Sequence, residues 1–293
     1  MRQTKTTTMA LGLTLVVAAA WAQTPINERR PATPGGTIEV ENVDGSVEVT
    51  GWSSSELEVT GTLDRGAERL EITGDGGALR VKVVLPHNVR QTGDTHLKIQ
   101  MPRGSRLRVE AVSASIDVRG VTGRVDLESV SGDVTVTGRP EGLEVESVSG
   151  TIEVEEAPSG ADLETVSGNV QVGRASGELE AASVSGDLAI TSGMLSRAEL
   201  STTSGDIRCA VDLTGPGPIE MESMSGSITL AVQSNVGGQF ELSTFSGSIE
   251  SDFGPEPQRT SKYAPGEELK FSLGTDPRVT ISSFSGSVVL SSR

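Results

Sequence analysis

The chain has 293 residues, a formal net charge of −16 and 35 glycines, but only one cysteine and 3% aromatic residues. The acidic balance excludes the usual nucleic-acid binders, which need a basic face to neutralise phosphates. The single Cys209 excludes an internal disulfide. The length would allow two domains, but a repeat protein grows by adding units and needs no second core.

Residues 1–22 are predicted to be a secretory signal peptide. Arg2 and Lys5 form a short basic region, the run from Met9 to Ala20 is apolar, and Ala20-Trp21-Ala22 resembles a cleavage site. This run is too short to span the ~30 Å bilayer core, and no later run reaches about 20 apolar residues. Loss of the two basic residues would change the charge from −16 to −18. We therefore expect an exported protein, in the periplasm or at the cell surface, without a transmembrane segment in the mature chain.

Residues 23–36 contain prolines and arginines without an apolar period and are predicted to be a flexible lead. A β-solenoid domain is predicted for residues 37–293, and its first copy of the repeat runs from Ile38 to Gly51. Residues 52–101 have a different rhythm of short strands, with a hairpin turn at Asp75-Gly76-Gly77. They are predicted to be a β-meander that caps the first coil, whose edge would otherwise expose unpaired hydrogen-bonding groups.

One four-residue phrase recurs through the rest of the chain. Counted at its Gly position, successive copies are 18, 18, 18, 18, 19, 21, 21 and 39 residues apart. A fixed period near 20 predicts stacked repeats. The copies are Ala111-Val112-Ser113-Ala114, in which Ala replaces Gly, then Ser129-Val130-Ser131-Gly132, Ser147-Val148-Ser149-Gly150, Thr165-Val166-Ser167-Gly168, Ser183-Val184-Ser185-Gly186, Thr202-Thr203-Ser204-Gly205, Ser223-Met224-Ser225-Gly226, Thr244-Phe245-Ser246-Gly247 and Ser283-Phe284-Ser285-Gly286.

Each repeat is predicted to contain two half-buried strands. Apolar and acidic residues alternate before the Gly, as in Val125 to Glu128, and apolar residues recur two and four places after it, as at Val134 and Val136. A second turn signal, such as Pro140-Glu141-Gly142, falls midway. An all-β solenoid with coils of roughly 18–21 residues is favoured over an antiparallel meander, because equivalent positions recur once per coil. Parallel pairing would then align like residues about 4.8 Å apart.

The recurring phrase is predicted to form the corner of each coil. The Val of each copy is expected to be buried, and the Gly is expected to provide a positive φ, with a relaxed corner at Ala114. The predicted buried column consists of Val130, Val148, Val166 and Val184, continued by Phe245 and Phe284. The bulkier Phe residues suggest that the stack widens where the repeat lengthens to 21 residues.

Residues 254–276 are predicted to be a polar insertion near the C-terminal end, which accounts for the 39-residue gap. Within it, residues 268–273 have the composition of an extra strand. The insertion is expected to fold over the edge of the stack.

Acidic residues recur six and four places before the Gly. Stacked carboxylates 4.8 Å apart repel by about 0.9 kcal/mol even in water, and few basic residues occupy these columns. A solvated acidic face is the simpler interpretation. Weak divalent cation binding is the alternative, although the glycine-rich repeat of calcium β-rolls is absent. The candidate strip consists of Asp126, Glu128, Glu144, Glu146, Asp162 and Glu164.

The sequence marks no catalytic site and no cofactor motif. Asp126 and Glu128 would lie about 7 Å apart on one strand, which suits an inverting glycosidase, but such pairs repeat in many coils, whereas a catalytic pair is singular. His87 and His96 have no marked partners and are interpreted as turn or surface residues. Cys209 falls at an inward position and is interpreted as a small core residue.

Several stretches resemble the exported bacterial putative-adhesin, or toastrack, β-strand-repeat family. They are IEVENVDGSVEVTGW at 38–52, MPRGSRLRVEAVSASIDVRG at 101–120, the recurring S-V-S-G-[DTN] and VTISSFSGSVVL at 279–290. The resemblance covers residues 35–293, departing at Ala114 and in the insertion after Phe253. It implies a right-handed β-solenoid, or β-helix, at the cell envelope, with roles in adhesion or envelope-stress sensing. It transfers no catalytic residue.

We therefore expect an exported, non-catalytic β-solenoid that acts as an interaction, adhesion-like or envelope-stress-associated module. Its expected partner is a protein or glycan at the cell envelope. A carbohydrate-active β-helix enzyme acting on cell-wall or extracellular polysaccharide is the alternative. A groove with a unique cluster of acids and basic residues would favour the enzyme, whereas a uniform exposed ladder would favour the module.

Overall fold

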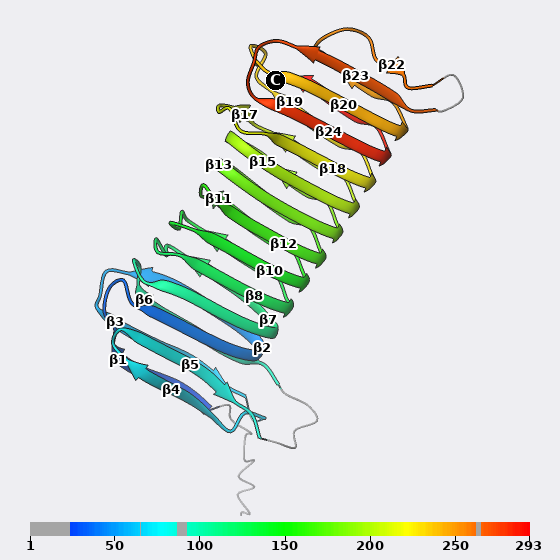
Figure 1. The fold of residues 1–293 in the computed structure, drawn as a ribbon. Coiled ribbons are helices and arrows are strands. Elements are labelled where there is room, and N and C mark those ends of the chain that lie inside the picture. Colours follow the sequence, from blue (N-terminus) through cyan, green and yellow to red (C-terminus); the bar gives the residue numbers. More distant parts are fainter. Residues whose placement is uncertain (1–23, 65, 87–92, 262–264) are drawn as a thin grey trace, which may run out of the picture.

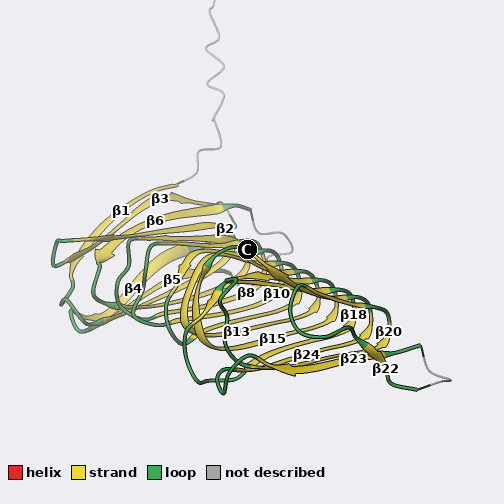
Figure 2. Cartoon of the chain, turned by 90° about the horizontal axis from the view of Figure 1, so that it is seen from above, coloured by secondary structure: helices red, strands yellow, loops and turns green. Residues whose placement is uncertain are grey.

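The computed structural model describes residues 24–64, 66–86, 93–261 and 265–293, and these form an all-β solenoid. Figure 1 shows an elongated stack of coils, and Figure 2 shows strands and loops but no helix in the described chain. The predicted signal peptide lies outside the described residues. None of the described segments forms a helix long and apolar enough to cross a membrane.

The regular coils pair in parallel, as the repeat predicts. Leu143 lies beside Val125 of the preceding coil and Ala161 of the following coil, so equivalent positions align. This register confirms the solenoid and excludes the antiparallel meander. The strands are β7 (Arg106–Arg119), β8 (Val125–Ser131), β9 (Val134–Thr137), β10 (Leu143–Ser149), β11 (Ile152–Ala157), β12 (Ala161–Ser167), β13 (Val170–Ser185), β14 (Leu188–Ile190), β15 (Gly193–Ser204), β16 (Ile207–Ala210), β17 (Asp212–Leu213), β18 (Ile219–Ser225) and β19 (Ile228–Val232).

The core lies inside the coils. Leu127 on β8 and Val134 on β9 are both buried, and the same two positions are filled by apolar side chains in every regular coil. Alternation with period two places the intervening acids outside. The two strands of one coil therefore bury their apolar faces against each other, and stacking joins these layers into one continuous core.

The predicted buried valine column is wrong, because these side chains point outward. Val148 is 49% exposed, whereas Ser147 before it is only 6% exposed. Leu143, Val145 and Ser147 alternate inward along β10, so Val148, which follows Ser147, faces solvent. The prediction relied on the hydrophobicity of valine, whereas strand alternation determines which way these side chains point. The same holds for Val130, Val166, Val184, Phe245 and Phe284, which are all exposed, so the Phe residues give no sign of a wider core.

The glycine of the phrase is required mainly by close backbone approach. Gly132 and Gly150 have the predicted positive φ, at 138° and 136°, but Gly168 does not adopt the left-handed region. A Cβ on Gly168 would lie 2.0 Å from the carbonyl oxygen of Gly150 in the preceding coil. Ala114 lies within the unbroken strand β7, paired with Gly45, and has no positive φ.

The N-terminal end is built from the first coil and strands laid against it. Strand β2 pairs with β7 on one side and, along its two halves, with β5 and β6 on the other. Strand β4 pairs antiparallel with β5, and β3 pairs antiparallel with β6. The bounds are β2 (Thr37–Trp52), β3 (Glu56–Leu63), β4 (Arg69–Asp75), β5 (Ala78–Val84) and β6 (Thr95–Pro102).

The expected flexible lead, residues 23–36, instead contains strand β1 (Thr24–Pro31), which pairs antiparallel with β3. Ile26 is its one buried side chain. The edge of β3 offers unpaired main-chain groups, and a polar segment can satisfy them without an apolar period of its own. Pro25 and Pro31 are tolerated because this is an edge strand.

At the C-terminal end, the order of the coils in space differs from their order in the chain. Strand β24 (Arg278–Ser285) lies between β18 and β20 (Gln239–Ser246), pairing in parallel with both (Figure 1). Strand β25 (Val288–Ser292) similarly separates β19 from β21 (Ile249–Ser251). The last coil of the sequence is thus inserted before the coil that precedes it in the chain.

Part of the predicted insertion, residues 254–276, covers the outer edge of this end. Strand β23 (Glu267–Ser272) pairs antiparallel with β20, and the short β22 (Gln258–Arg259) pairs with β23. The extra strand expected at 268–273 is therefore present, one residue earlier. It satisfies main-chain groups that β20 would otherwise expose.

Candidate interaction face

The first strands of the coils carry two outward columns in which acidic residues predominate. We call the residues six places before the Gly the outer column, and those four places before it the inner column. In the outer column, Glu144 lies beside Asp126 and Asp162, and the pairing continues through Glu180, Glu199 and Glu220. Thr280 separates Glu220 from Glu241 because β24 is inserted between their strands.

The inner column consists of Glu110, Glu128, Glu146 and Glu164, followed by Ala182 and Ser201. The structure thus brings together all six residues of the strip predicted from the sequence, on the first strands of three successive coils. Arg108 forms ion pairs with Glu110 and Glu128, whereas neither Glu146 nor Glu164 forms an ion pair among the described residues.

Arginines neutralise the N-terminal part of both columns. The Arg124 guanidinium lies 2.7 Å from Asp126 and 2.6 Å from Glu144, while Arg108 contacts Glu110 at 3.0 Å and Glu128 at 2.5 Å. The hydrogen bond to Asp126 is the largest cause of the raised pKa of Arg124. Sequence reasoning missed this pairing, since Arg124 stands outside the columns. Its position two residues before Asp126, on the same face of an extended chain, was the available signal.

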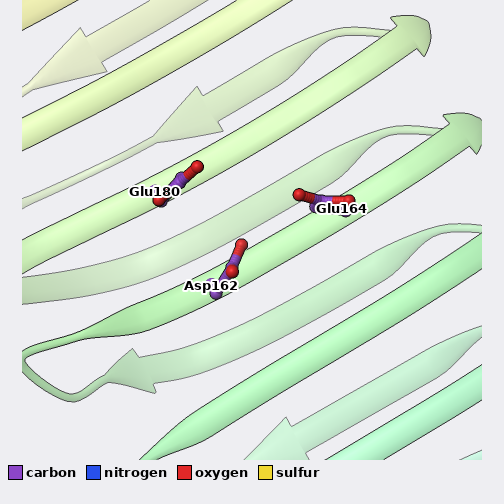
Figure 3. Close-up of side chains that lie close together, drawn as sticks. All are labelled: Asp162, Glu164 and Glu180. Carbon is purple, nitrogen blue, oxygen red and sulfur yellow. The ribbon is translucent and has the colours of Figure 1, made fainter.

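Beyond the arginines, Asp162, Glu164 and Glu180 form a compact carboxylate cluster. Oxygen atoms from the three side chains lie within 4.8 Å of one another (Figure 3). Burial raises the pKa of Asp162, and the charges of Glu180, Glu144 and Glu146 raise it further. Its Oδ1 atom is buried without a hydrogen-bond partner. Carboxylates suit hard cations, but three of them, two exposed, fall short of the six to eight oxygens that calcium takes.

A row of exposed apolar side chains runs beside the inner column. We call Val112, Val130, Val148, Val166 and Val184 the valine ridge; each is between 46% and 49% exposed. Thr203 interrupts the row, which then continues with Met224, Phe284 and Phe245. The two phenyl rings stack with centroids 4.8 Å apart. Stacking of this kind accounts for outward aromatic residues at this position.

A groove separates the inner acidic column from the valine ridge. It has a volume of about 810 Å³ and extends from Glu41 and Val43 on the first coil to Ser201 and Thr203. The residues between the two rows, such as Ser147, are buried, so the strand backbone forms the floor of the groove. The groove is therefore acidic along one wall and apolar along the other.

The residue after the Gly forms a hydrogen-bonded ladder along the corner. The Oδ1 atom of Asp187 accepts a hydrogen bond from the amide of Asp206, one coil later, at 2.9 Å. Asn169 accepts from the amide of Asp187 in the same way, and Asp206 from that of Ser227. The Asp or Asn that follows the Gly in several copies was the sequence signal for this ladder, whose role is structural.

The other candidate residues fit the structural roles expected of them. Cys209 is buried, and burial raises the pKa of its thiol to about 12, which suits a core residue. His96 is paired through Nδ1 with the hydroxyl of Ser46 at 2.9 Å, at an exposed site. His87 lies outside the described residues. Among the residues described, the only grouping of three carboxylate, thiol or imidazole ligands is the cluster around Asp162.

Several solved structures resemble the chain at low identity. A putative adhesin from Bacteroides fragilis has 15% identity and a TM-score of 0.34, covering 93% of this chain and 98% of that one. A putative adhesin from Parabacteroides distasonis has 13% identity and a TM-score of 0.36, covering 91% and 97%. A putative lipid binding protein from Parabacteroides distasonis has 12% identity and a TM-score of 0.34, covering 91% and 96%. No curated protein matches the chain.

The family comparison covers nearly the whole chain described above. The model described as Toastrack DUF4097 matches residues 36–291, from the start of strand β2 to the end of the last coil. The match spans the stacked coils and the strands at both ends. The chain therefore belongs to the toastrack family.

Proposed function

We propose that the protein is an exported, non-catalytic interaction module that works at the cell envelope. The observation that carries this proposal is the repetition of one exposed pattern, acid, groove and apolar side chain, over successive coils. A surface of this kind offers many equivalent contacts to an elongated or repeating partner. Contacts to such a partner add along the stack, so each coil can be weak.

The same repetition supports a binding role over catalysis. General acid and base roles need two carboxylates in different environments, so that their pKa values differ. Here Asp126 and Glu144 share one arginine. The pair formed by Glu144 and Glu146 also recurs in the neighbouring coils, where the equivalent residues are exposed to a similar degree. Burial and neighbouring carboxylates raise the pKa of Asp162, but the groups that raise it are acids of the same repeating columns, Glu180, Glu144 and Glu146.

Export is supported by the basic and apolar segment that precedes Gln23 and by the Ala20-Trp21-Ala22 triplet. The absence of disulfides is compatible with this location, because each coil is stabilised by hydrogen bonds and packing against its neighbours and needs no covalent cross-link.

The test measures whether the purified protein binds isolated cell envelopes through this face. Labelled protein should cosediment with envelopes, and the fourfold variant Glu146→Gln, Val148→Ser, Glu164→Gln and Val166→Ser should bind at least fivefold less. The control variant Glu153→Gln with Glu155→Gln removes two charges from the exposed side of β11 and should bind normally. Equal binding by all three proteins, or no binding, would contradict the proposal. Release of reducing sugars from the envelopes would support the enzyme instead.

Weak divalent cation binding at Asp162, Glu164 and Glu180 is a secondary part of the proposal. Low millimolar calcium should raise the melting temperature more than sodium chloride at matched ionic strength, because a bridging cation offsets carboxylate repulsion. Glu164→Gln with Glu180→Gln should remove the excess, while Glu153→Gln with Glu155→Gln should keep it. If the two salts act alike, the strip is a solvated face.

A further inference from the structure

We propose that the groove between the valine ridge and the inner acidic column binds a cationic amphipathic α-helix lying along the axis of the stack. The apolar side of the helix would cover the ridge, and its flanking Lys or Arg residues would reach the glutamates. This inference rests on the proposed function and names the chemical class of its partner.

The ridge provides the apolar half of the interaction. Val148, Val166 and Val184 follow one another in adjacent coils, each about half exposed, with no described side chain covering them. Scattered exposed apolar residues are normal on protein surfaces, but a contiguous row beside polar residues marks an interaction site. Burial of these side chains would be the main source of affinity.

The inner column determines the charge of the partner. Arg108 pairs with Glu110 and Glu128, but neither Glu146 nor Glu164 forms an ion pair with a described basic residue. These two carboxylates line the groove together with the exposed Val148 and Val166. A second copy docked face to face, or a membrane of anionic lipids, would bring like charges together. A basic partner would bring opposite charges together.

The spacing of the coils favours a helix over an extended peptide. Equivalent side chains recur about every 4.8 Å along the stack. Side chains on one face of a helix recur about once per turn, at i, i+3 or i+4, and i+7, with a pitch of about 5.4 Å, which is close to the coil spacing. Alternate residues of an extended strand are about 6.6 Å apart and would lose register within two coils. From Val112 to Val184 the ridge spans about 19 Å, the length of about 13 helical residues.

The probe is a fluorescein-labelled synthetic 18-residue peptide of Leu and Lys, with Leu on one helical face and Lys on the flanks. Fluorescence anisotropy at 150 mM salt should show saturable binding at micromolar peptide, with a gain of helical circular dichroism on mixing. Val148→Ser with Val166→Ser, and separately Glu146→Gln with Glu164→Gln, should each weaken binding at least fivefold. The matched control, Glu153→Gln with Glu155→Gln, should change it less than twofold.

Two control peptides test the shape of the partner. One has the same composition with Leu spread around the helix, and the other has two central prolines that prevent a continuous helix. Both should bind at least fivefold more weakly. Equal binding of either peptide, or no effect of the valine substitutions, would overturn the proposal in favour of unspecific charge attraction or an extended ligand.

Other occupants give different outcomes. Concentration-dependent dimers in analytical ultracentrifugation that the valine substitutions abolish would identify a second copy, and ridge-dependent binding to phosphatidylcholine vesicles would identify a lipid surface; either would overturn the helix. All variants must melt within about 2 °C of the parent protein, so that a loss of binding cannot be attributed to unfolding. If envelope binding persists while the peptide fails to bind, only the helix proposal is wrong. If the peptide binds and the envelopes do not, the proposed function is wrong.

Discussion

The phenyl rings of Phe245 and Phe284 stack face to face, with centroids 4.8 Å apart and planes inclined by 6°, although Phe284 belongs to the last coil of the chain. Phe284 lies on the inner of the two coils, between Met224 and Phe245. The place of Phe284 next to the coil of Met224 records an exchange in coil order, which no spacing between repeats reveals.

Cysteine pairs should report this exchange directly. Glu220 and Thr280 are register partners on adjacent strands, about 4.8 Å apart, so Glu220→Cys with Thr280→Cys should form a disulfide under mild oxidation. Glu220→Cys with Glu241→Cys should not, because the two positions are separated by the strand that holds Thr280. Non-reducing electrophoresis after proteolysis distinguishes the results. The buried Cys209 should not compete. The opposite pattern would restore the order of the sequence.

Substitution of the valine ridge should leave the fold intact. Val148 is half exposed, so Val148→Ser should change the free energy of unfolding by less than about 0.5 kcal/mol. Val145, on the same strand, is fully buried, and Val145→Ala should cost roughly 1–3 kcal/mol through lost burial and a residual cavity. Urea denaturation measures both. A larger cost at Val148 than at Val145 would mean that the ridge belongs to the core.

The corner glycines should resist substitution for reasons of space. In Gly168→Ala, the new methyl group would lie 2.0 Å from the Gly150 carbonyl oxygen, so the two coils would have to separate. We expect a loss of about 3 kcal/mol. Gly104→Ala is the control, because a Cβ there would meet no atom within 4 Å. Thermal melts of the two variants that coincide would refute the close approach.

The ladder after the glycines should depend on the acceptor oxygen and not on charge. Asp187→Ala leaves the amide of Asp206 without its partner and should cost about 1–3 kcal/mol. Asp187→Asn retains the oxygen, as Asn169 does one coil earlier, and should cost less than half as much. Chemical denaturation provides both values. If Asn and Ala are equally harmful, the carboxylate charge matters more than the hydrogen bond.

The acidic strip should make stability depend on pH through Asp162. Its pKa is raised in the folded protein by burial and by neighbouring carboxylates, so the folded chain holds this proton more tightly than the unfolded chain. Stability from this group is therefore present at low pH and is lost as pH rises through the folded pKa. Asp162→Asn should gain about 1 kcal/mol at pH 7, the water-screened repulsion of one carboxylate pair, and nearly nothing at pH 3.5. Melting temperatures across that range test it; a gain that is constant with pH would contradict it.

The coils and both acidic columns follow from local rules and could be predicted. The period aligns Asp126 with Glu144, and strand alternation buries Leu127 and Val145 while exposing the acids between them. The groove was not predicted, because hydrophobicity alone predicts that the valines of its second wall are buried. Had alternation been followed through Ser147, Val148 would have been placed outside.

The two ends depend on pairings that leave little trace in the sequence. All coils have similar strand edges, so the sequence around Val279 does not determine which coils it will pair with. In the structure Val279 pairs with both Ile219 and Phe240. Strand β1 joins β3 mainly through its backbone, and one buried Ile26 is too weak a signal to mark a strand.

The inserted last coil has a consequence for how the stack is completed. Residues 239–277 are synthesised before residues 278–293, yet the later segment must occupy the space between them and the coil of Ile219. A chain that folded coil by coil as it emerged would join β20 directly to β18 and would then have to release it. Completion of this end must therefore wait until the later segment is available, so these last coils cannot assemble in the order of synthesis.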